Sequence, residues 1–389
     1  MAATSFKKDS MMSILIGADI VPTKSNNVYF ASGNMQDVVG VGLLNLLSKS
    51  DYRIFNLECP LVNADTPIQK CGPNLKAEVS TAKGLKSIGA DLLTLANNHI
   101  MDHGNAGLES TISILEKENI SFLGAGKNLE VAAKPFVFYI NDKKIGVYAC
   151  AEHEFSIAEG NKPGANPFDP LESFDHVVNL KKDCDYVIVL YHGGKEYYRY
   201  PSPMLQHICR KFVQKGADLV ICQHSHCIGC EEKYHDGTIV YGQGNFIFNS
   251  INASLSQTSL LIEIKDDFRI DYIPLEKHGC GIRLAKNDAA KNIISDFYHR
   301  SEQIKNAEFV KREYSKFAKD MLNHYLLTCS GYGHKFALKF FNKLSRYKMT
   351  DFIISRFRTK ELLAIRNFIE CEAHRELFVE GLKNEPFFI

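Results

Sequence analysis

The sequence contains no apolar stretch of the roughly 18 residues that a membrane-spanning helix needs. Its first residues, MAATSFKKDSMM, lack the apolar core of a secretory signal peptide. The 11 cysteines occur singly or in loose pairs rather than at the spacings of a small disulfide scaffold, which favours a reducing compartment. We therefore expect a cytoplasmic protein without a transmembrane segment.

The sequence also lacks an excess of charge of either sign. Its 46 Lys and Arg residues oppose 45 Asp and Glu residues, and a net charge of +1 argues against a general binder of nucleic acid or another polyanion. Hydrophobic residues at 45% and charged residues at 23% are typical of a globular protein. Because 389 residues exceed the usual range of one domain, we expect a large domain with an appendage.

Short apolar runs alternate with amphipathic segments and Gly or Pro from Ser13 to about His278, which predicts an α/β domain over residues 1–280. Two segments interrupt this alternation and predict hairpins. VFYINDKKIGVYAC turns at Asn141 and Asp142, and LLIEIKDDFRIDYIPL turns at residues 266–267. The sheets are therefore expected to be mixed.

Residues 281–389 have helical periodicity and almost no proline before Pro386, which predicts an α-helical extension. This segment contains 20 Lys and Arg against 13 Asp and Glu, a surplus of seven positive charges. Two interpretations stay open. The charges lie on solvated helix faces packed against the main domain, or the helices dock to an acidic partner or an anionic membrane surface, as KFALKFFNKLSRYK suggests.

Polar side chains that can bind metal ions follow five apolar runs of the predicted strands. The carboxyl edge of an open α/β sheet is where ligands bind. One histidine on an apolar face is more often a hydrogen-bonded core residue than a ligand, but five such coincidences favour a shared site. The residues are Asp19 after SILIGA, Glu58 after YRIFNL, Asn97, Asn98 and His99 after DLLTLA, His192 after YVIVLY, and His224 and His226 after the run that ends at Cys222.

Six of these side chains supply two carboxylates, one amide and three imidazoles: Asp19, Glu58, Asn98, His192, His224 and His226. A purely carboxylate cage favours Mg²⁺ or Ca²⁺, whereas this mixture suits Mn, Fe or Zn. We therefore predict one or two divalent metal ions. Two ions held close together make hydroxide available near neutral pH and clamp the oxygens of a tetrahedral centre, so hydrolysis or group transfer at phosphorus or at a carbonyl is expected.

His99 is the candidate general acid. If Asn98 binds metal, the next imidazole stands just outside the ligand shell, where it can protonate a leaving group, and Asp102 or His103 could orient it. The alternative is that NNHIMDHG simply connects a strand to a helix, with Asn97 or Asn98 as the helix cap.

Three further motifs have alternative interpretations. Cys227-x-x-Cys230 could indicate structural zinc or a redox pair, although no second pair stands at a suitable spacing. The glycines of GAGKN and GQGNF match neither a dinucleotide fingerprint nor a P-loop and are better explained as turns. Asn245 in GQGNF either closes the site by a hydrogen bond or occupies a turn.

Seven ordered blocks resemble a known family. GADIVPT, FNLECPL, KCGPNLKA, TLANNHIMDHGNAGLEST, LGAGKNLEVAAKP, YHGGKEYYRYPSP and QHSHCIGCEEKYHDGTIVYGQGNFIF look like the CapA-type poly-γ-glutamate capsule biosynthesis family, over about Ile14 to Phe248. That family is related to the calcineurin-like metallophosphoesterases. The resemblance implies a metallophosphoesterase-like four-layer α/β/β/α sandwich with mixed sheets, here followed by the C-terminal helices.

The resemblance also implies roles for individual residues. Asp19 matches the first acidic ligand, Glu58 the bridging carboxylate, Asn98 a metal ligand and His99 the general acid, while His192, His224 and His226 match the remaining ligands. Lys76, Glu196 and Tyr197 match residues that line the substrate pocket in relatives, and with Asn97 they are the predicted substrate-binding residues.

Two positions depart from the phosphoesterase pattern. Phosphoesterases carry a histidine two residues after the first aspartate, where this sequence has Val21, so one metal position lacks a ligand. The bridging aspartate is replaced by Glu58, whose longer side chain changes the distance between the metals. CapA-type proteins generally share the missing histidine, and many carry a membrane anchor that this sequence lacks.

Two functions are therefore expected as alternatives. The first is a metal-dependent hydrolase or transferase acting on a phosphoester or a γ-glutamyl-type amide, linked to poly-γ-glutamate or capsule polymer metabolism. The second is a non-catalytic component of a polymer synthesis or export machine that binds partners through its basic helices.

Overall fold

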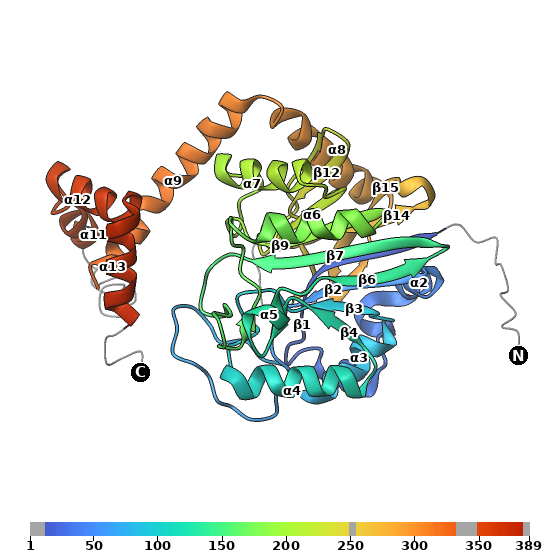
Figure 1. The fold of residues 1–389 in the computed structure, drawn as a ribbon. Coiled ribbons are helices and arrows are strands. Elements are labelled where there is room, and N and C mark those ends of the chain that lie inside the picture. Colours follow the sequence, from blue (N-terminus) through green and yellow to red (C-terminus); the bar gives the residue numbers. More distant parts are fainter. Residues whose placement is uncertain (1–11, 249–253, 332–347, 384–389) are drawn as a thin grey trace, which may run out of the picture. The chain divides into compact units, whose positions relative to one another are not determined.

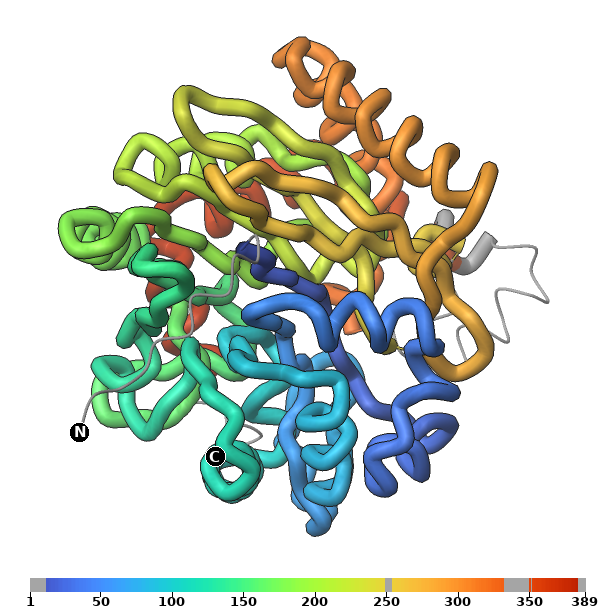
Figure 2. Tube along the Cα trace, turned by 90° about the vertical axis from the view of Figure 1, so that its right-hand side faces the viewer, coloured from blue at the N-terminus to red at the C-terminus, as the bar shows by residue number. Residues whose placement is uncertain are grey.

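The computed structural model describes residues 12–248, 254–331 and 348–383. The chain divides into two compact units, Met1–Val310 and Lys311–Ile389. The predicted site residues all belong to the first unit. Figure 2 shows the N-terminal segments of this unit, in blue, gathered on one side and its green and yellow segments on the other.

An eight-stranded sheet is built on the first strand of the chain. Its strands are β1 (Ser13–Val21), β2 (Tyr52–Leu57), β3 (Leu92–Thr94), β4 (Ser121–Leu123), β13 (Asn245–Phe248), β14 (Thr258–Lys265), β15 (Ile270–His278) and β16 (Gly281–Leu284). The order across the sheet is β16-β15-β14-β1-β2-β3-β4, and β13 pairs with the last residues of β1. The strands β1 to β4 are parallel, as are β1 and β13.

A six-stranded sheet faces the first. Its strands are β6 (Phe136–Ile140), β7 (Lys143–Ala151), β9 (Tyr186–His192), β10 (Leu219–Gln223), β11 (Glu231–Tyr234) and β12 (Gly237–Tyr241). Their order is β11-β12-β10-β9-β7-β6, with β7, β9, β10 and β12 parallel. A two-stranded ribbon joins β5 (Ala125–Gly126) to β8 (Gly164–Ala165).

Helices cover the outer faces of both sheets (Figure 1). In the first unit they are α1 (Asn27–Ser32), α2 (Gln36–Lys49), α3 (Ala82–Ser87), α4 (Gly104–Lys117), α5 (Leu129–Ala132), α6 (Ser173–Asp183), α7 (Pro203–Gln214) and α8 (Asn287–Gln303). Helix α9 (Ala307–Cys329) leads into the second unit, which contains α11 (Lys348–Ile354), α12 (Thr359–Glu370) and α13 (Glu372–Lys383). None of the helices among the described residues is long and apolar enough to cross a membrane.

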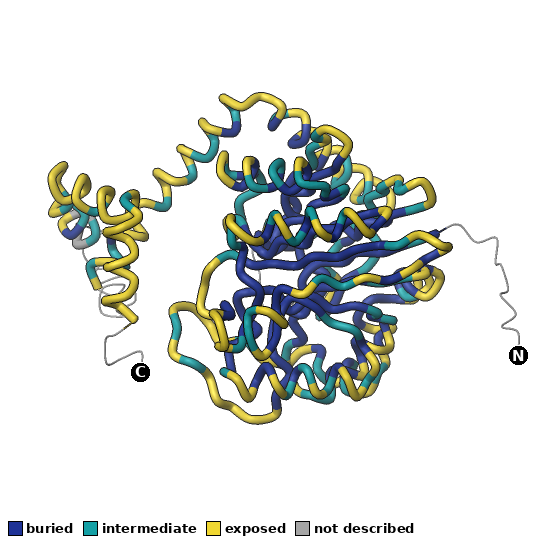
Figure 3. Tube along the Cα trace, viewed as in Figure 1, coloured by how far each residue is buried: buried dark blue, intermediate teal, exposed yellow. Residues whose placement is uncertain are grey.

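The sequence of β9 explains the layers. Successive side chains of a strand point to opposite faces. Val187, Val189 and Tyr191 pack in the core beneath α6 and α7, whereas Ile188 and Leu190 pack against the eight-stranded sheet. A strand that is apolar at every position is therefore covered on both faces, and Figure 3 shows such strands buried between exposed helix surfaces. The predicted four-layer α/β/β/α arrangement is confirmed.

Both predicted hairpins are present. Asn141 and Asp142 connect the antiparallel strands β6 and β7 with φ angles of 48° and 63°, the left-handed conformation that a tight two-residue hairpin needs. The second turn contains Asp267 with a φ of 60° between β14 and β15. Asn and Asp tolerate this conformation better than other non-glycine residues, which is why the sequence revealed both turns.

The second unit begins later than the boundary predicted between residues 280 and 281. Strand β16 pairs with β15 at the edge of the eight-stranded sheet. Phe297 of α8 is fully buried and lies against Tyr272 of β15, with ring centroids 4.7 Å apart. The helical periodicity begins near residue 281, but α8, the first helix after that point, still packs on the eight-stranded sheet. Residues 335–347 of the basic segment lie outside the described residues.

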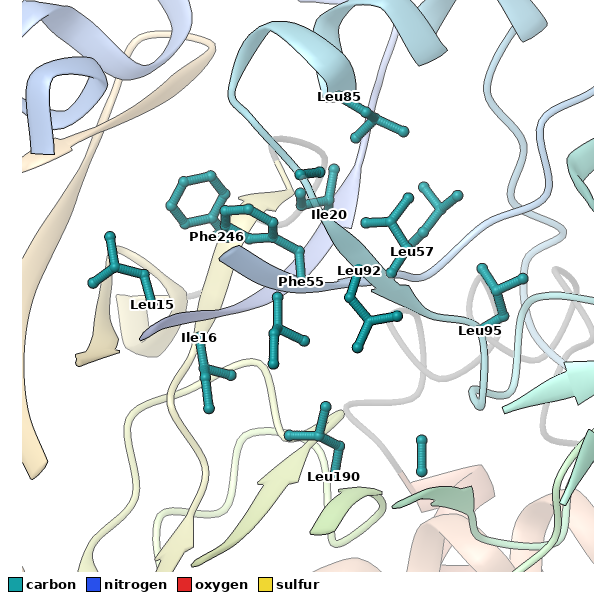
Figure 4. Close-up of a cluster of buried hydrophobic side chains, with 14 of the residues drawn as sticks. Leu15, Ile16, Ile20, Phe55, Leu57, Leu85, Leu92, Leu95, Leu190 and Phe246 are labelled. Atoms are coloured by element: carbon teal, nitrogen blue, oxygen red, sulfur yellow. The ribbon is translucent and has the colours of Figure 1, made fainter. Parts of the chain in front are cut away.

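The two sheets are joined by an apolar core. Leu190 of β9 is 1% exposed and belongs to the same cluster as Ile16 of β1 and Leu92 of β3. In Figure 4 its side chain lies below those of Ile16 and Leu92, on the side of the six-stranded sheet.

Replacing Leu190 by Ala should lower the free energy of unfolding by about 2–5 kcal/mol, because the cavity lies between two rigid sheets. Leu171, which is 79% exposed, provides the matched control, and Leu171→Ala should change stability by less than about 0.5 kcal/mol. Urea unfolding monitored by circular dichroism measures both. Equal effects would contradict the role of Leu190 in joining the sheets.

Candidate metal centre

Parallel pairing brings the predicted ligands to one edge of the sheets. Asp19 of β1 lies beside Asn56 of β2, and His192 of β9 lies beside Gln223 of β10. The carboxyl ends of parallel strands share an edge, so the side chains that follow them converge. All six predicted ligands are buried, with exposures between 0% and 7%: Asp19, Glu58, Asn98, His192, His224 and His226.

A first cluster of potential ligand atoms surrounds His192. Its Nε2 lies 3.0 Å from Asn98 Oδ1 and 3.2 Å from Glu58 Oε1. Two ligands bound to one ion at about 2.1 Å are separated by about 3 Å, so this spacing suits a shared cation. The amide of Asn98 is oriented by Glu154, whose Oε2 accepts a 3.1 Å hydrogen bond from Asn98 Nδ2. This bond turns the carbonyl oxygen of Asn98 toward His192.

A second cluster surrounds His226. Its Nδ1 lies 3.6 Å from Asp19 Oδ2 and 2.9 Å from Asn245 Oδ1. Glu58 connects the two clusters, because one ligand atom each of Glu58, His224 and His226 lie within 4.8 Å of one another. The geometry therefore places two groups of potential ligand atoms side by side, with Glu58 between them.

Burial sets the protonation of this centre. It raises the pKa of Glu58 to about 8, with a further contribution from the neighbouring Asp19 carboxylate. Burial lowers the pKa of His192 to about 4 and that of His224 well below the ordinary value. Burial also acts to lower the pKa of His226, but Glu58 and Asp19 outweigh it and the net shift is upward. His192 and His224 are thus neutral at pH 7, the form in which imidazole binds metals.

The histidine pair is held in a strained backbone. His224 and His226 have φ angles of 80° and 53°, and Tyr197, whose N–H donates to Ser225 O at 2.8 Å, has a φ of 58°. Non-glycine residues in this region are uncommon and carry of order 1–3 kcal/mol of strain each. The surrounding contacts maintain these backbone angles. The angles direct both imidazoles toward Glu58.

Asn56 is a site residue that the sequence reasoning missed. Its Nδ2 donates to Asp19 Oδ1 at 2.8 Å, and its Oδ1 accepts from Asn97 Nδ2 at 3.1 Å. Its position within the apolar run was the available signal, because residues i and i+2 of a strand share a face and Asn56 stands two before Glu58.

Asn97, predicted to contact substrate, is fully buried and engaged within the protein. Its Nδ2 also donates to Leu57 O at 2.8 Å, and its Oδ1 accepts from His99 N at 3.1 Å. The geometry therefore assigns Asn97 to organising the loop that carries His99.

His99 is oriented by Asp102 and by a lysine that the sequence did not reveal. Nδ1 of His99 lies 2.6 Å from Asp102 Oδ2, and Asp102 Oδ1 accepts from Lys70 Nζ. Lys70 Nζ also lies 3.1 Å from His99 Nδ1, and its side chain is only 2% exposed. Leu75 N donates to Asp102 Oδ2 at 2.6 Å. Of the two predicted orienting residues, Asp102 makes the contact with His99, whereas Nδ1 of His103 accepts from Thr66 N.

The remaining predicted substrate residues lie in two places. Glu196 is exposed and close enough to influence the pKa values of Glu58 and His226, and the ring of Tyr197 lies 6.1 Å from that of His226. Both therefore adjoin the centre. Lys76 is exposed, and its Nζ pairs with Asp65 at 2.8 Å. The contacts described for Lys76 do not include the six clustered side chains.

The cysteines near the histidine pair are core residues. Cys227 and Cys230 are completely buried, and Cys230 belongs to the core beneath α6 and α7. Burial raises the pKa of the Cys227 thiol to about 11 and also raises that of Cys230. Both changes disfavour the thiolate that zinc binding or disulfide exchange requires.

The sequence matches the family described as bacterial capsule synthesis protein PGA_cap over residues 14–250. This match covers more than half of the chain and includes every residue of the two clusters. The chain belongs to this family.

Two relatives within curated proteins show how far the family likeness extends. The chain is 31% identical to the capsule biosynthesis protein CapA of Bacillus anthracis over 212 residues, which are 52% of this chain and 52% of that protein. It is 28% identical to the PGA biosynthesis protein CapA of Bacillus subtilis (strain 168) over 258 residues, 62% of this chain and 66% of that protein. The match thus spans about half to two thirds of the relatives' length.

Among solved structures, a phosphatase from Mycoplasma pneumoniae aligns with 69% of this chain and 94% of its own, at 16% identity and a TM-score of 0.43.

Lys70→Ala should lower the free energy of unfolding by about 3–5 kcal/mol, because it leaves the buried Asp102 carboxylate without its cation. Lys76→Ala removes an exposed lysine of the same loop, whose pairing with the exposed Asp65 contributes little to stability. Denaturant unfolding of the two variants beside the wild type measures the difference. A Lys70→Ala variant as stable as Lys76→Ala would show that the ion pair does not hold this loop.

Proposed function

We propose that this member of the capsule synthesis family is a metal-dependent hydrolase or transferase. It would act on a phosphoester or a γ-glutamyl-type amide in poly-γ-glutamate or capsule polymer metabolism. The observation that supports this proposal is the pair of ligand clusters that share Glu58 at the carboxyl edge of the two sheets.

The residues fit a divalent cation. Among the described residues, neither carboxylate oxygen of Glu58 has a hydrogen-bond partner, and His224 Nδ1 also has none, although all three atoms are buried. Burying unpartnered polar atoms is costly, and a cation would compensate all three at once. The mixture of imidazole, amide and carboxylate ligands favours Mn, Fe or Zn over Mg or Ca.

The cation would supply a Lewis acid that activates water and polarises the phosphoryl or carbonyl oxygen of the substrate. His99 would then act as general acid. Asp102 accepts the Nδ1 proton of His99, which fixes the ring and leaves Nε2 as the atom that delivers a proton to the leaving group. Glu196 and Tyr197, beside His226, are the proposed substrate contacts.

Metal content measured by mass spectrometry tests the proposal. Wild-type protein should hold one or two equivalents of Mn, Fe or Zn, and Asp19→Ala and His224→Ala should hold less, because each loses a ligand. His99→Ala should keep the metal but lose about 10²-fold or more in rate on any phosphoester or γ-glutamyl amide that the wild type cleaves. Circular dichroism confirms that each variant is folded.

Wild-type protein that holds no stoichiometric metal after reconstitution would sink the proposal and favour a non-catalytic, partner-binding component. An unchanged rate in His99→Ala, with metal retained, would overturn only the role of His99.

Metal binding at pH 7 should release the proton of Glu58, together with any proton held by His226, whose pKa is also raised. With a pKa of about 8, Glu58 is mostly protonated at pH 7 without metal, and cation binding requires its carboxylate. Its raised pKa makes affinity increase as the pH rises toward 8 and level off above it. Calorimetric titration in buffers of different ionisation enthalpy counts the protons. Glu58→Gln should release fewer, and proton-neutral binding by the wild type would contradict the shift.

A further inference from the structure

The second cluster contains three of the predicted ligands, Asp19, His226 and the shared Glu58. The first cluster also contains an amide oxygen, that of Asn98. Val21 stands where the phosphoesterases that the sequence resembles carry a histidine. It is 2% exposed, lies in β1, and has no atom that can bind a metal.

Asn245 adds an amide oxygen to the second cluster. Strand β13 runs parallel to β1 and places Asn245 beside Asp19. The carbonyl oxygen of Asn245 lies 2.9 Å from His226 Nδ1, the same nitrogen that lies 3.6 Å from Asp19 Oδ2. Asn245 is 5% exposed, and its Nδ2 is buried without a hydrogen-bond partner among the described residues.

The arrangement repeats that of the first cluster. There an amide oxygen, of Asn98, lies 3.0 Å from an imidazole nitrogen that also faces a carboxylate at 3.2 Å. Here the amide oxygen of Asn245, the imidazole nitrogen of His226 and the carboxylate of Asp19 form the same trio. The two ends of the centre are thus built from the same three kinds of group.

The chemistry of His226 distinguishes a ligand from a hydrogen-bond acceptor. A ring nitrogen that binds a cation carries no proton and cannot donate one. If a cation binds between Asp19 and His226 Nδ1, His226 can no longer donate a hydrogen bond to Asn245 Oδ1. The oxygen of Asn245 would then face the cation instead. We propose that Asn245 is a ligand of the second metal position and replaces the histidine absent at Val21.

This inference rests on the proposed function and adds a ranking of the two positions. The ring of His224 lies 4.9 Å from that of His192 and 5.9 Å from that of His226, so the first position has the Asn98 carbonyl with two imidazoles. The second has the Asn245 amide oxygen with one imidazole, that of His226. Imidazole suits Fe and Zn better than a neutral amide oxygen does. The second position should therefore bind its cation more weakly than the first.

Calorimetric titration with Zn²⁺ tests this assignment on the full chain. Wild-type protein should bind two equivalents, and Asn245→Ala should retain the tighter one but bind the weaker at least about 10-fold less tightly. Asn245→Asp should restore the second equivalent, because a carboxylate oxygen replaces the amide oxygen. Asn34→Ala, at an exposed asparagine of the same unit, is the control and should bind as the wild type does.

A rescue variant separates a ligand from a residue that merely orients His226. Side chains two apart in a strand share a face, so a histidine at position 21 points to the same side as Asp19. Val21→His combined with Asn245→Ala should regain the second equivalent if Asn245 is a ligand. Thermal unfolding of the metal-free variants identifies any that do not fold, and Asn245→Asp then carries the test.

Three results would contradict the assignment of Asn245 as a ligand or the function on which it rests. Two equivalents of unchanged affinity in Asn245→Ala would overturn the inference, as would a single equivalent in both wild type and Asn245→Ala, and both results leave the proposed function standing. A wild type that binds no Mn²⁺, Fe or Zn would remove the proposed function itself.

Discussion

The packing of the two sheets against each other is the constraint on which the candidate metal centre depends. His192 belongs to one sheet and Asn98 follows a strand of the other, so their 3.0 Å contact is set by the distance between the sheets. Leu190, Ile16 and Leu92 fill the space behind this contact. A binding site tolerates displacements of only about 0.5 Å, and close packing of the core is what holds two separate sheets within that limit.

This rigidity also allows the centre to remain electrostatically unfavourable. Two carboxylates, Asp19 and Glu58, are fully buried near each other, and the histidine pair adopts left-handed backbone angles. A less constrained fold would relax by moving a carboxylate to water or straightening the backbone. Here the hydrogen bonds of Asn56 to Asp19 and of Asn97 to Asn56 keep the Asp19 carboxylate buried. Strand pairing on both sides of β10 holds the backbone that leads into the histidine pair. The fold therefore holds together buried carboxylates and strained backbone that would otherwise relax.

The sequence predicted those site residues that directly follow an apolar run. An abrupt change from apolar to polar residues at the end of a buried strand is a local signal, and it identified Asp19, Glu58, Asn98 and His192. Asn56 was missed because it lies inside the apolar run, where a single polar residue does not indicate a binding site. Lys70 was missed because its loop has no periodicity, and its burial arises from tertiary contacts with Asp102 and His99. The boundary after residue 280 was predicted from amphipathic periodicity, which indicates a helix but does not reveal the sheet on which α8 packs.

Lys70 and Asp102 also connect the loop before α3 to His99, the proposed general acid. Residues 63–77 contain no regular strand or helix, so their backbone is held by individual contacts. Three of these converge on Asp102, whose backbone oxygen accepts from Ile68 N and whose carboxylate accepts from Leu75 N and Lys70 Nζ. The same carboxylate orients His99. Because the buried Asp102 carboxylate contacts both the loop and His99, the position of the loop and the orientation of the imidazole are coupled. A change that opens the loop therefore leaves His99 free to rotate, even though the loop itself contributes no metal ligand.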